Sequence, residues 1–429
     1  MKTGLVFGGG GAKGAYEIGV WKAIRELDIH VDIVTGTSIG SLIGAMFVQD
    51  EFDKAYELWK NVSAGDVIKE GLSLDYDIDL IMSQKGHYKQ LFSTILNNRG
   101  VADISPFITM IDQMFNPEKF FASDIDYACM TTKIPSLAGT PFIKGSMDKD
   151  KVKDYLLASA SCFPAFPIKE IDGEKYVDGG YYDNVPIELA RSMGAEFVIA
   201  VDLKAPGKRR EKAPQENLIY IKPYVPLGSF LNFEHEVLVR NIDLGYLDTL
   251  KKFDKLYGYV YAFDKSSFYD LSLFEENFNK FLKVRNKRVS KKLSDHIYED
   301  MFDHSMAHYH NYQFKHLRLL ELAAYLYELD LTKVYTFEPF IDSLLEAFKD
   351  YTYVEYVPIE KSKLPLLKDV AIDIKKFSRR DIIHFLYQRI EKEFEEGKDV
   401  LEYLSLLFPS EYTLALVFFM LEEIYSKDW

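Results

Sequence analysis

A serine framed by two glycines is the residue best placed to do chemistry in this chain. Gly36-Thr37-Ser38-Ile39-Gly40 follows the mostly apolar run Val31-Asp32-Ile33-Val34. The Gly-x-Ser-x-Gly spacing predicts a sharp strand-to-helix turn that exposes the Ser38 hydroxyl, with Gly36 and Gly40 permitting the close backbone approach. A serine hydroxyl is a weak nucleophile at neutral pH, so it needs a base and donors for the charge that develops on an attacked carbonyl. Ser38 is therefore the candidate nucleophile.

A glycine-rich segment near the N-terminus offers such donors. Gly8-Gly9-Gly10-Gly11-Ala12-Lys13-Gly14 follows the apolar run Leu5-Val6-Phe7. Both segments follow predicted strands, and open α/β sheets bind ligands at the carboxyl ends of their strands. We expect the amides of Gly10, Gly11 and Ala12 to face the same sheet edge as Ser38 and to form an oxyanion hole.

Nucleotide binding is the competing interpretation of the glycines. Gly9-x-Gly11-x-x-Gly14 fits a dinucleotide fingerprint, which also needs an acidic residue at the far end of the second strand. Asp32 has the spacing but begins its strand. A Walker loop fails because Lys13 is followed by Gly14 rather than by Ser or Thr. We therefore predict no nucleotide partner.

The base is less clear from the residues alone. His87 and His235 are candidates, and so is Asp178 in Val177-Asp178-Gly179-Gly180, where a carboxylate ends an apolar strand. An ordinary aspartate is a weak base, but burial would raise its pKa. A turn aspartate that binds its own backbone is the alternative for Asp178.

The ordered set of motifs resembles the patatin-like phospholipases. Gly-Gly-Gly-x-Lys-Gly, Gly-x-Ser-x-Gly and Asp-Gly-Gly occur in that order, with Ala158-Ser159 and Asn184-Val185-Pro186 as further agreements. The resemblance covers residues 3–205, with trailing elements to about 264. It implies a Ser–Asp dyad in which Ser38 attacks and Asp178 accepts the proton. It also implies an oxyanion loop made of Gly9, Gly10, Gly11, Ala12, Lys13 and Gly14.

The resemblance also implies an activity. Family members cleave carboxylic esters of phospholipids, lysophospholipids or related acyl lipids through an acyl-enzyme, without a metal or other cofactor. The substrate would be an acyl lipid, met at a membrane surface or lipid aggregate. Two alternatives stay open: a non-catalytic lipid-binding or scaffold protein on the same fold, and an acyltransferase.

Periodicity predicts the fold class. Strands are expected at 5–7, 31–35 and 197–201, helices at 15–27 and 38–48, and a hairpin turns at Asp172-Gly173. Alternating strands and helices predict a three-layer α/β/α sandwich with a mostly parallel central sheet. Residues 65–125 are less regular, with helices expected near 88–96 and 106–115. Residues 206–214 are polar and basic, which indicates an exposed loop.

Residues 265–429 are predicted to form a mainly helical second domain, since Gly397 is the only glycine after Gly258. His304 and His308 share a helical spacing, and a basic run spans 283–292. Both are expected to be solvated helix faces, not a metal site or a headgroup site.

Composition narrows the class of protein. The 429 residues carry a net charge of −14 and are 48% hydrophobic, which argues against nucleic acid as a partner and against a membrane-embedded chain. Cys129 and Cys162 fit no disulfide framework or metal spacing. With no signal peptide recognised, a cytoplasmic location is expected, with possible peripheral contact at a membrane.

Overall fold

The structure is a computed structural model of the chain, and it describes residues 1–69, 102–210, 216–285, 314, 316–353, 377–396 and 408–425. The chain divides into two compact units, Met1–Asp254 and Lys255–Trp429. Several sequence predictions lie outside the described residues: His87, the helix near 88–96, His304, His308 and most of the basic run 283–292.

The first unit is built on an eight-stranded sheet in the order β5-β6-β3-β2-β1-β7-β8, with β4 pairing on β3. Neighbours from β3 to β8 along this order run parallel, while β4 and β6 run antiparallel to β3 and β5 antiparallel to β6. The strands are β1 Thr3–Phe7, β2 Ile33–Thr37, β3 Asp126–Ile134, β4 Ala138–Ile143, β5 Lys169–Ile171, β6 Glu174–Asp178, β7 Phe197–Val201 and β8 Leu218–Ile221.

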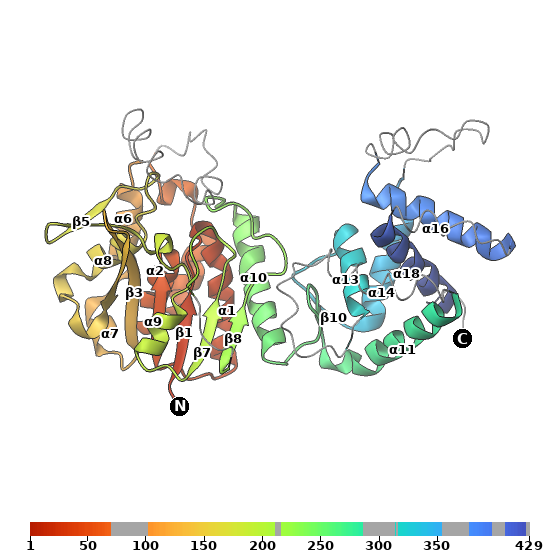
Figure 1. Cartoon of the computed structure of the whole chain (residues 1–429), viewed down its shortest axis with the longest axis horizontal. Helices are drawn as coiled ribbons and strands as arrows, with labels where there is room; N and C mark the ends of the chain where they lie inside the picture. The colour runs from red at the N-terminus through yellow and green to blue at the C-terminus, as the bar shows by residue number, and fades with distance from the viewer. Residues whose placement is uncertain are drawn as a thin grey trace. The chain divides into compact units, whose positions relative to one another are not determined.

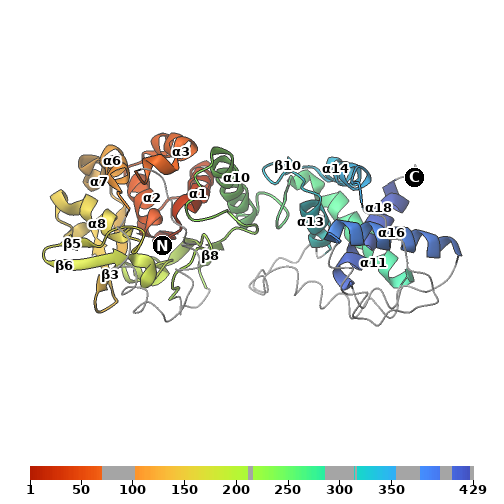
Figure 2. The ribbon, with the colours of Figure 1, turned by 90° about the horizontal axis from the view of Figure 1, so that it is seen from above.

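Helices cover both faces of this sheet, as Figures 1 and 2 show. Along β1, Val6 packs in the same cluster as Ala190 of α9, whereas the neighbouring Phe7 lies 6.2 Å from the ring of Phe47 on α2. Successive residues of a strand point to opposite faces, so α9 and α2 cover opposite faces. The helices are α1 Ala15–Glu26, α2 Ile39–Val48, α3 Phe52–Asn61, α6 Ser105–Met114, α7 Pro117–Ala122, α8 Val152–Ser159, α9 Ile187–Ser192 and α10 His235–Lys252.

The predicted α/β/α sandwich with a mostly parallel sheet is confirmed, with two differences in detail. Strand β2 begins at Ile33, because Asp32 lies in a bend and accepts a hydrogen bond of 2.7 Å from the Thr3 amide. Strands β3, β4 and β8 were not predicted. The threonines of β3 look exposed in sequence, but Thr131 and Thr132 are buried, and their hydroxyls donate to the carbonyls of Thr140 and Asp178.

The described residues of the second unit are mainly helical, as predicted, and include a short parallel strand pair. Its core is rich in aromatic rings. The Phe348 ring stacks on the rings of His384 and Phe418, with ring centroids 4.1 and 4.0 Å apart. The elements are β9 Ala262–Phe263, α11 Phe268–Arg285, α13 Leu317–Leu326, β10 Val334–Tyr335, α14 Phe337–Lys349, α16 Arg379–Glu396 and α18 Pro409–Tyr425.

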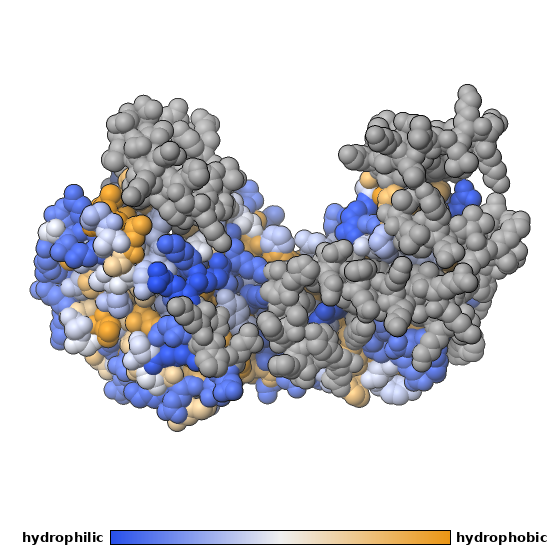
Figure 3. Space-filling model, in the orientation of Figure 1, coloured by the Kyte–Doolittle hydropathy of each residue, from blue (hydrophilic) through white to orange (hydrophobic). Residues whose placement is uncertain are grey.

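The surface of the first unit is predominantly hydrophilic on the face shown in Figure 3, with scattered hydrophobic patches. Exposed large hydrophobic side chains of that unit include Ile108, Leu137 and Ile143. Across the described ranges, no helix combines the length and apolar character that a membrane crossing requires.

Candidate functional site

Ser38 sits at a strained turn between β2 and α2. Its backbone has φ 55° and ψ −126°, a left-handed conformation that a non-glycine residue adopts only where the surroundings impose it. A Cβ on Gly40 would lie 2.5 Å from the Phe7 carbonyl oxygen, and a Cβ on Gly36 would collide with the Gly40 carbonyl. Both glycines are therefore needed for the turn, as the motif predicted.

Hydrogen bonds to neighbouring segments of the chain hold the turn in place. The Ser38 amide donates to the Ser159 hydroxyl at 2.9 Å, and that hydroxyl donates to the Met130 carbonyl at 2.7 Å. The Ser41 hydroxyl donates to the Ser38 carbonyl at 2.6 Å. These bonds satisfy the backbone around Ser38 and fix the turn that carries its side chain.

The sheet register explains why Asp178 reaches Ser38. Thr37, the last residue of β2, pairs with Met130 of β3, and Asp178, the last residue of β6, pairs with Thr131. Strand β3 extends past the end of β2, and β6 runs antiparallel along this extension. Strand β4 pairs along the other edge of β3, so β2 and β6 lie along the same edge of β3. They end at adjacent positions on that edge, so their last residues converge.

Asp178 is buried and has a perturbed pKa. Burial raises the pKa of its carboxyl to about 6, although hydrogen bonding with Ser38 and the Gly180 amide acts in the opposite direction. The Gly180 amide donates to Oδ1 at 2.7 Å. Asp178 thus forms the backbone-capping turn that was its alternative interpretation, and it also interacts with Ser38.

The glycine loop passes beside Ser38. A Cβ on Gly9 would lie 3.2 Å from the Cβ of Ser38. Residues Gly11–Gly14 form a short 3-10 turn that leads into α1. Within the described residues, the amides of Gly10 and Gly11 have no hydrogen-bond partner, which leaves them available to an anion.

The other amides of the loop are already engaged, which narrows the predicted oxyanion hole. The Gly9 amide donates to the Asn184 carbonyl at 3.0 Å, the Ala12 amide to the Phe230 carbonyl at 2.8 Å and the Lys13 amide to the Gly10 carbonyl at 3.2 Å. The Ala12 N–H is thus bound to the Phe230 carbonyl, whereas, in the described part of the chain, the N–H groups of Gly10 and Gly11 are open to a ligand. Gly14 instead gives close packing, since a Cβ there would lie 2.8 Å from the Trp59 ring.

An apolar pocket opens beside Ser38. It holds about 620 Å³ of unfilled space, including its open mouth. Apart from Ser38 and Gly11, its walls among the described residues are aliphatic and aromatic. They come from α2, α3, α6, the segments that follow α3 and α8, and the loop that precedes α10 (Ile39, Leu42, Ile43, Leu58, Trp59, Val62, Val67, Phe107, Met110, Met114, Ala160, Phe166, Phe230, Leu231 and Phe233). Such a lining suits a hydrocarbon chain and not a nucleotide.

The alternative residues lie elsewhere. The His235 ring is exposed at the start of α10 and bonds the Lys60 carbonyl at 2.6 Å, so its contact in the described structure is not with Ser38. Asp32 lies before β2, at the amino end of the strand, as the argument against a dinucleotide required.

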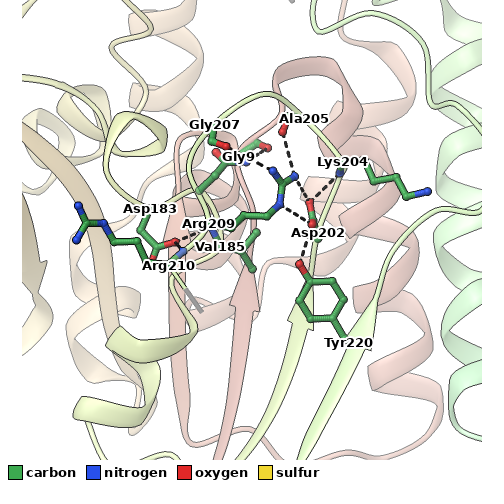
Figure 4. Close-up of polar contacts among 11 residues, drawn as sticks. Gly9, Asp183, Val185, Asp202, Lys204, Ala205, Gly207, Arg209, Arg210 and Tyr220 are labelled. Atoms are coloured by element: carbon green, nitrogen blue, oxygen red, sulfur yellow. Dashed lines mark hydrogen bonds and ion pairs between the residues drawn. The ribbon is translucent and has the colours of Figure 1, made fainter. Parts of the chain in front are cut away.

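A polar network behind the site was not predicted (Figure 4). The Asn184 carbonyl and side chain both bond Gly9, and Asn184 itself is held by the segment 202–210. Within that segment, Arg209 binds Asp202. The predicted exposed loop is confirmed at Lys208, Arg209 and Arg210. The ion pair of Arg209 with the buried Asp202 was not predicted, because the sequence does not show which acid a loop arginine binds.

The fold defines a mostly parallel α/β unit with a Gly-x-Ser-x-Gly turn at the carboxyl edge of its sheet. Residues 5–191 match the sequence model of the patatin-like phospholipase family. This part of the chain is therefore a patatin-like phospholipase domain, and the predicted family is confirmed.

Two of three similar proteins carry the same family name. Patatin-like phospholipase domain-containing protein 7 of Rattus norvegicus is 32% identical over 204 residues, 46% of this chain and 13% of that protein. Protein 6 of that series from Homo sapiens is 32% identical over 206 residues, again 46% and 13%. Lysophospholipase nte1 of Aspergillus fumigatus is 32% identical over 214 residues, 50% of this chain and 12% of that protein. The chain thus spans about one eighth of the length of these curated relatives.

Among solved structures, VipD from Legionella pneumophila aligns over 99% of this chain and 91% of that one, with 13% identity and a TM-score of 0.39.

Proposed function

We propose that this chain is a serine lipid acyl hydrolase with Ser38 as nucleophile and Asp178 as proton acceptor. The observation that carries the proposal is the placement of a strained, anchored serine between a buried carboxyl of raised pKa and an apolar pocket. The membership of residues 5–191 in the patatin-like phospholipase family supports the same chemistry.

The geometry suggests how each residue acts. The Ser38 oxygen attacks the ester carbonyl carbon while its proton passes to the Asp178 carboxylate. The amides of Gly10 and Gly11 hold the oxyanion of the tetrahedral intermediate. The proton then goes to the leaving alcohol, which departs and leaves an acyl-enzyme. Water attacks the acyl-enzyme, Asp178 accepts its proton, and the fatty acid is released as Ser38 recovers the proton.

The pocket supports an acyl lipid as substrate. Its apolar walls would accept the hydrocarbon chain of a phospholipid, a lysophospholipid or a related lipid, and place the ester at Ser38. Each buried methylene contributes roughly 0.8 kcal/mol to chain binding. A substrate of this kind resides in a bilayer or micelle, so the protein would act at the surface of a lipid aggregate.

Replacing the nucleophile tests the proposal. Ser38→Ala is expected to lower the hydrolysis of lysophosphatidylcholine and of a p-nitrophenyl ester by at least about 1,000-fold. It should also abolish covalent labelling by a fluorophosphonate. Ser192→Ala is the matched control, because that hydroxyl donates to the Leu189 carbonyl within α9.

Three outcomes separate the alternatives. Hydrolysis by Ser38→Ala at the wild-type rate would remove Ser38 from the reaction. Absence of hydrolysis and of labelling in the wild-type protein would favour a non-catalytic lipid-binding role. Formation of an acylated alcohol when glycerol is added would indicate an acyltransferase.

A further inference from the structure

Asp202 and Arg209 form a close ion pair just behind the glycine loop (Figure 4). Asp202 follows the last residue of β7, and its side chain is 7% exposed. Arg209 donates from Nε to Oδ2 at 2.7 Å and from Nη2 to Oδ1 at 2.6 Å. Burial alone would raise the pKa of Asp202, but the hydrogen bonds and charge of Arg209 hold it below its ordinary value. A two-bond contact of this type fixes orientation as well as distance.

The pair closes the intervening chain on itself. The Lys204 amide donates to Oδ1 of Asp202 at 2.8 Å, and Nη2 of Arg209 donates to the Ala205 carbonyl at 3.0 Å. The Tyr220 hydroxyl donates to Oδ2 of Asp202 at 2.7 Å and ties the pair to β8. We call residues 202–209, closed in this way, the clasp.

The clasp is hydrogen-bonded to Asn184, which contacts the glycine loop, and to Gly180, which contacts Asp178. The Asn184 amide donates to the Lys208 carbonyl at 2.6 Å, and the Lys208 amide donates to the Gly180 carbonyl at 2.9 Å. Asn184 receives the Gly9 amide on its carbonyl and donates from Nδ2 to the Gly9 carbonyl, both at 3.0 Å. Gly180 also donates its amide to the carboxyl of Asp178.

We propose that Asp202 and Arg209 are positioning residues: through Lys208 and Asn184 they set the placement of the glycine loop against Ser38 and of the turn that carries Asp178. The clasp lies outside residues 5–191, the part that matches the family model. The predicted effect of the clasp on turnover rests on the proposed function, but its effect on the placement of the glycine loop does not.

The positions served by the clasp are those where small displacements matter most. An oxyanion is stabilised only by donors set at hydrogen-bond distance from where its charge develops, and a shift of about 1 Å costs on the order of 100-fold in rate. Because the apolar pocket has walls from other elements, loosening the clasp should leave the affinity for an acyl chain almost unchanged.

Kinetics of clasp variants test the proposal. Arg209→Lys keeps the charge but donates from a single point, so kcat for a p-nitrophenyl ester should fall by about tenfold or more while KM changes less than about twofold. Asp202→Asn should behave alike, and the double variant should be no worse than either single one. Free guanidinium ion should restore part of the kcat of Arg209→Ala.

Arg210→Gln is the matched control from the same segment. Arg210 bonds the Tyr182 carbonyl at 3.1 Å and stacks on the Tyr182 ring, and this variant leaves the bonds between Arg209 and Asp202 in place. It should retain the wild-type kcat. If Asp202 and Arg209 only stabilised the fold, their variants would have a lower melting temperature without a selective loss of kcat.

Hydrogen exchange supplies a readout that needs no reaction. In the intact Arg209→Lys protein, the amides of residues 8–14 should exchange faster than in wild type, whereas those of α9 should not change. Unchanged exchange of the loop together with unchanged kcat would overturn the clasp. Faster exchange in a protein whose Ser38→Ala variant remains active would keep the clasp and reject the proposed function.

Discussion

Asp178 is subject to two effects that shift its pKa in opposite directions. It is buried, which favours the neutral acid, and it contacts a serine and an amide, which favour the carboxylate; burial prevails and the pKa rises to about 6. A base whose pKa lies closer to the working pH holds a proton more readily during the reaction. In the proposed mechanism, burial therefore makes Asp178 a better proton acceptor than its ordinary pKa suggests.

The pH dependence of activity should report this carboxyl. Because Asp178 must be ionised to accept a proton, kcat/KM should fall about tenfold for each pH unit below about 6 and level off above it. Asp178→Asn should abolish turnover at all pH values, whereas His235→Ala should keep both the rate and the acid limb. A greater loss in His235→Ala or His87→Ala than in Asp178→Asn would replace the dyad with a histidine triad.

Asp183 supplies the control for the acid limb. Burial raises its pKa also to about 6, and its carboxyl accepts from the Val185 and Arg210 amides, so it is a similar carboxyl with other partners. Asp183→Asn should therefore keep the limb near pH 6. Loss of that limb in Asp183→Asn, and not in a folded Asp178 variant with residual activity, would assign the titration to Asp183.

The same pKa fixes the sign of a stability effect. The native carboxyl of Asp178 binds a proton more tightly than the unfolded one, so this stabilisation is complete below about pH 4 and is lost as the pH rises through about 6. Relative to wild type, Asp178→Asn should gain about 2–3 kcal/mol in the free energy of unfolding between pH 4 and pH 8. Urea denaturation at the two pH values measures this difference.

At the scale of elements, the loop between β8 and α10 supplies part of the pocket wall. Phe230, Leu231 and Phe233 line the pocket from residues beyond the family match. The Ala12 amide binds the Phe230 carbonyl, and the Asn241 side chain donates to the Leu227 carbonyl at 2.8 Å. The loop is thereby attached to the glycine loop at one point and to α10 at another.

Shortening an aromatic wall should change chain-length preference. Phe233→Ala removes apolar surface that would contact the substrate, and a buried aromatic side chain contributes about 1.5–3 kcal/mol. KM for a C16 ester should rise about tenfold or more, while KM for a C4 ester should change little. Phe142→Ala is the control, because Phe142 stacks on Tyr155 at 4.1 Å and does not line the pocket. Equal losses for both esters would show that Phe233 does not contact the chain.

The elements differ in how well the sequence predicted them. Strands β1, β2 and β7 and helices α1 and α2 were predictable because continuous apolar runs alternate with helical spacing and glycine turns. Strand β3 was not, because its buried threonines are satisfied by distant carbonyls. The approach of Asp178 to Ser38 depends on the register of β2 and β6 on β3, which local pattern does not encode. The residues alone made Asp178 one of three candidate bases, and the family resemblance selected it.

At the scale of the whole molecule, every residue assigned a role here belongs to the first unit. Ser38, Asp178, the glycine loop, the clasp and the described pocket walls lie within Met1–Asp254, as does the complete eight-stranded sheet. The second unit has its own aromatic core around Phe348. A unit with its own core is expected to fold by itself.

Separating the units tests whether the first one suffices for the chemistry. A fragment of residues 1–254 should fold cooperatively, label with a fluorophosphonate at Ser38 and hydrolyse a soluble C4 ester with kcat/KM within about threefold of the full chain, since the proposed machinery is complete within it. The full chain and the fragment should then be compared on micelles of lysophosphatidylcholine. A loss confined to micelles would assign the second unit to work at the lipid surface. A folded fragment that fails on the soluble ester would show that residues after 254 complete the active site.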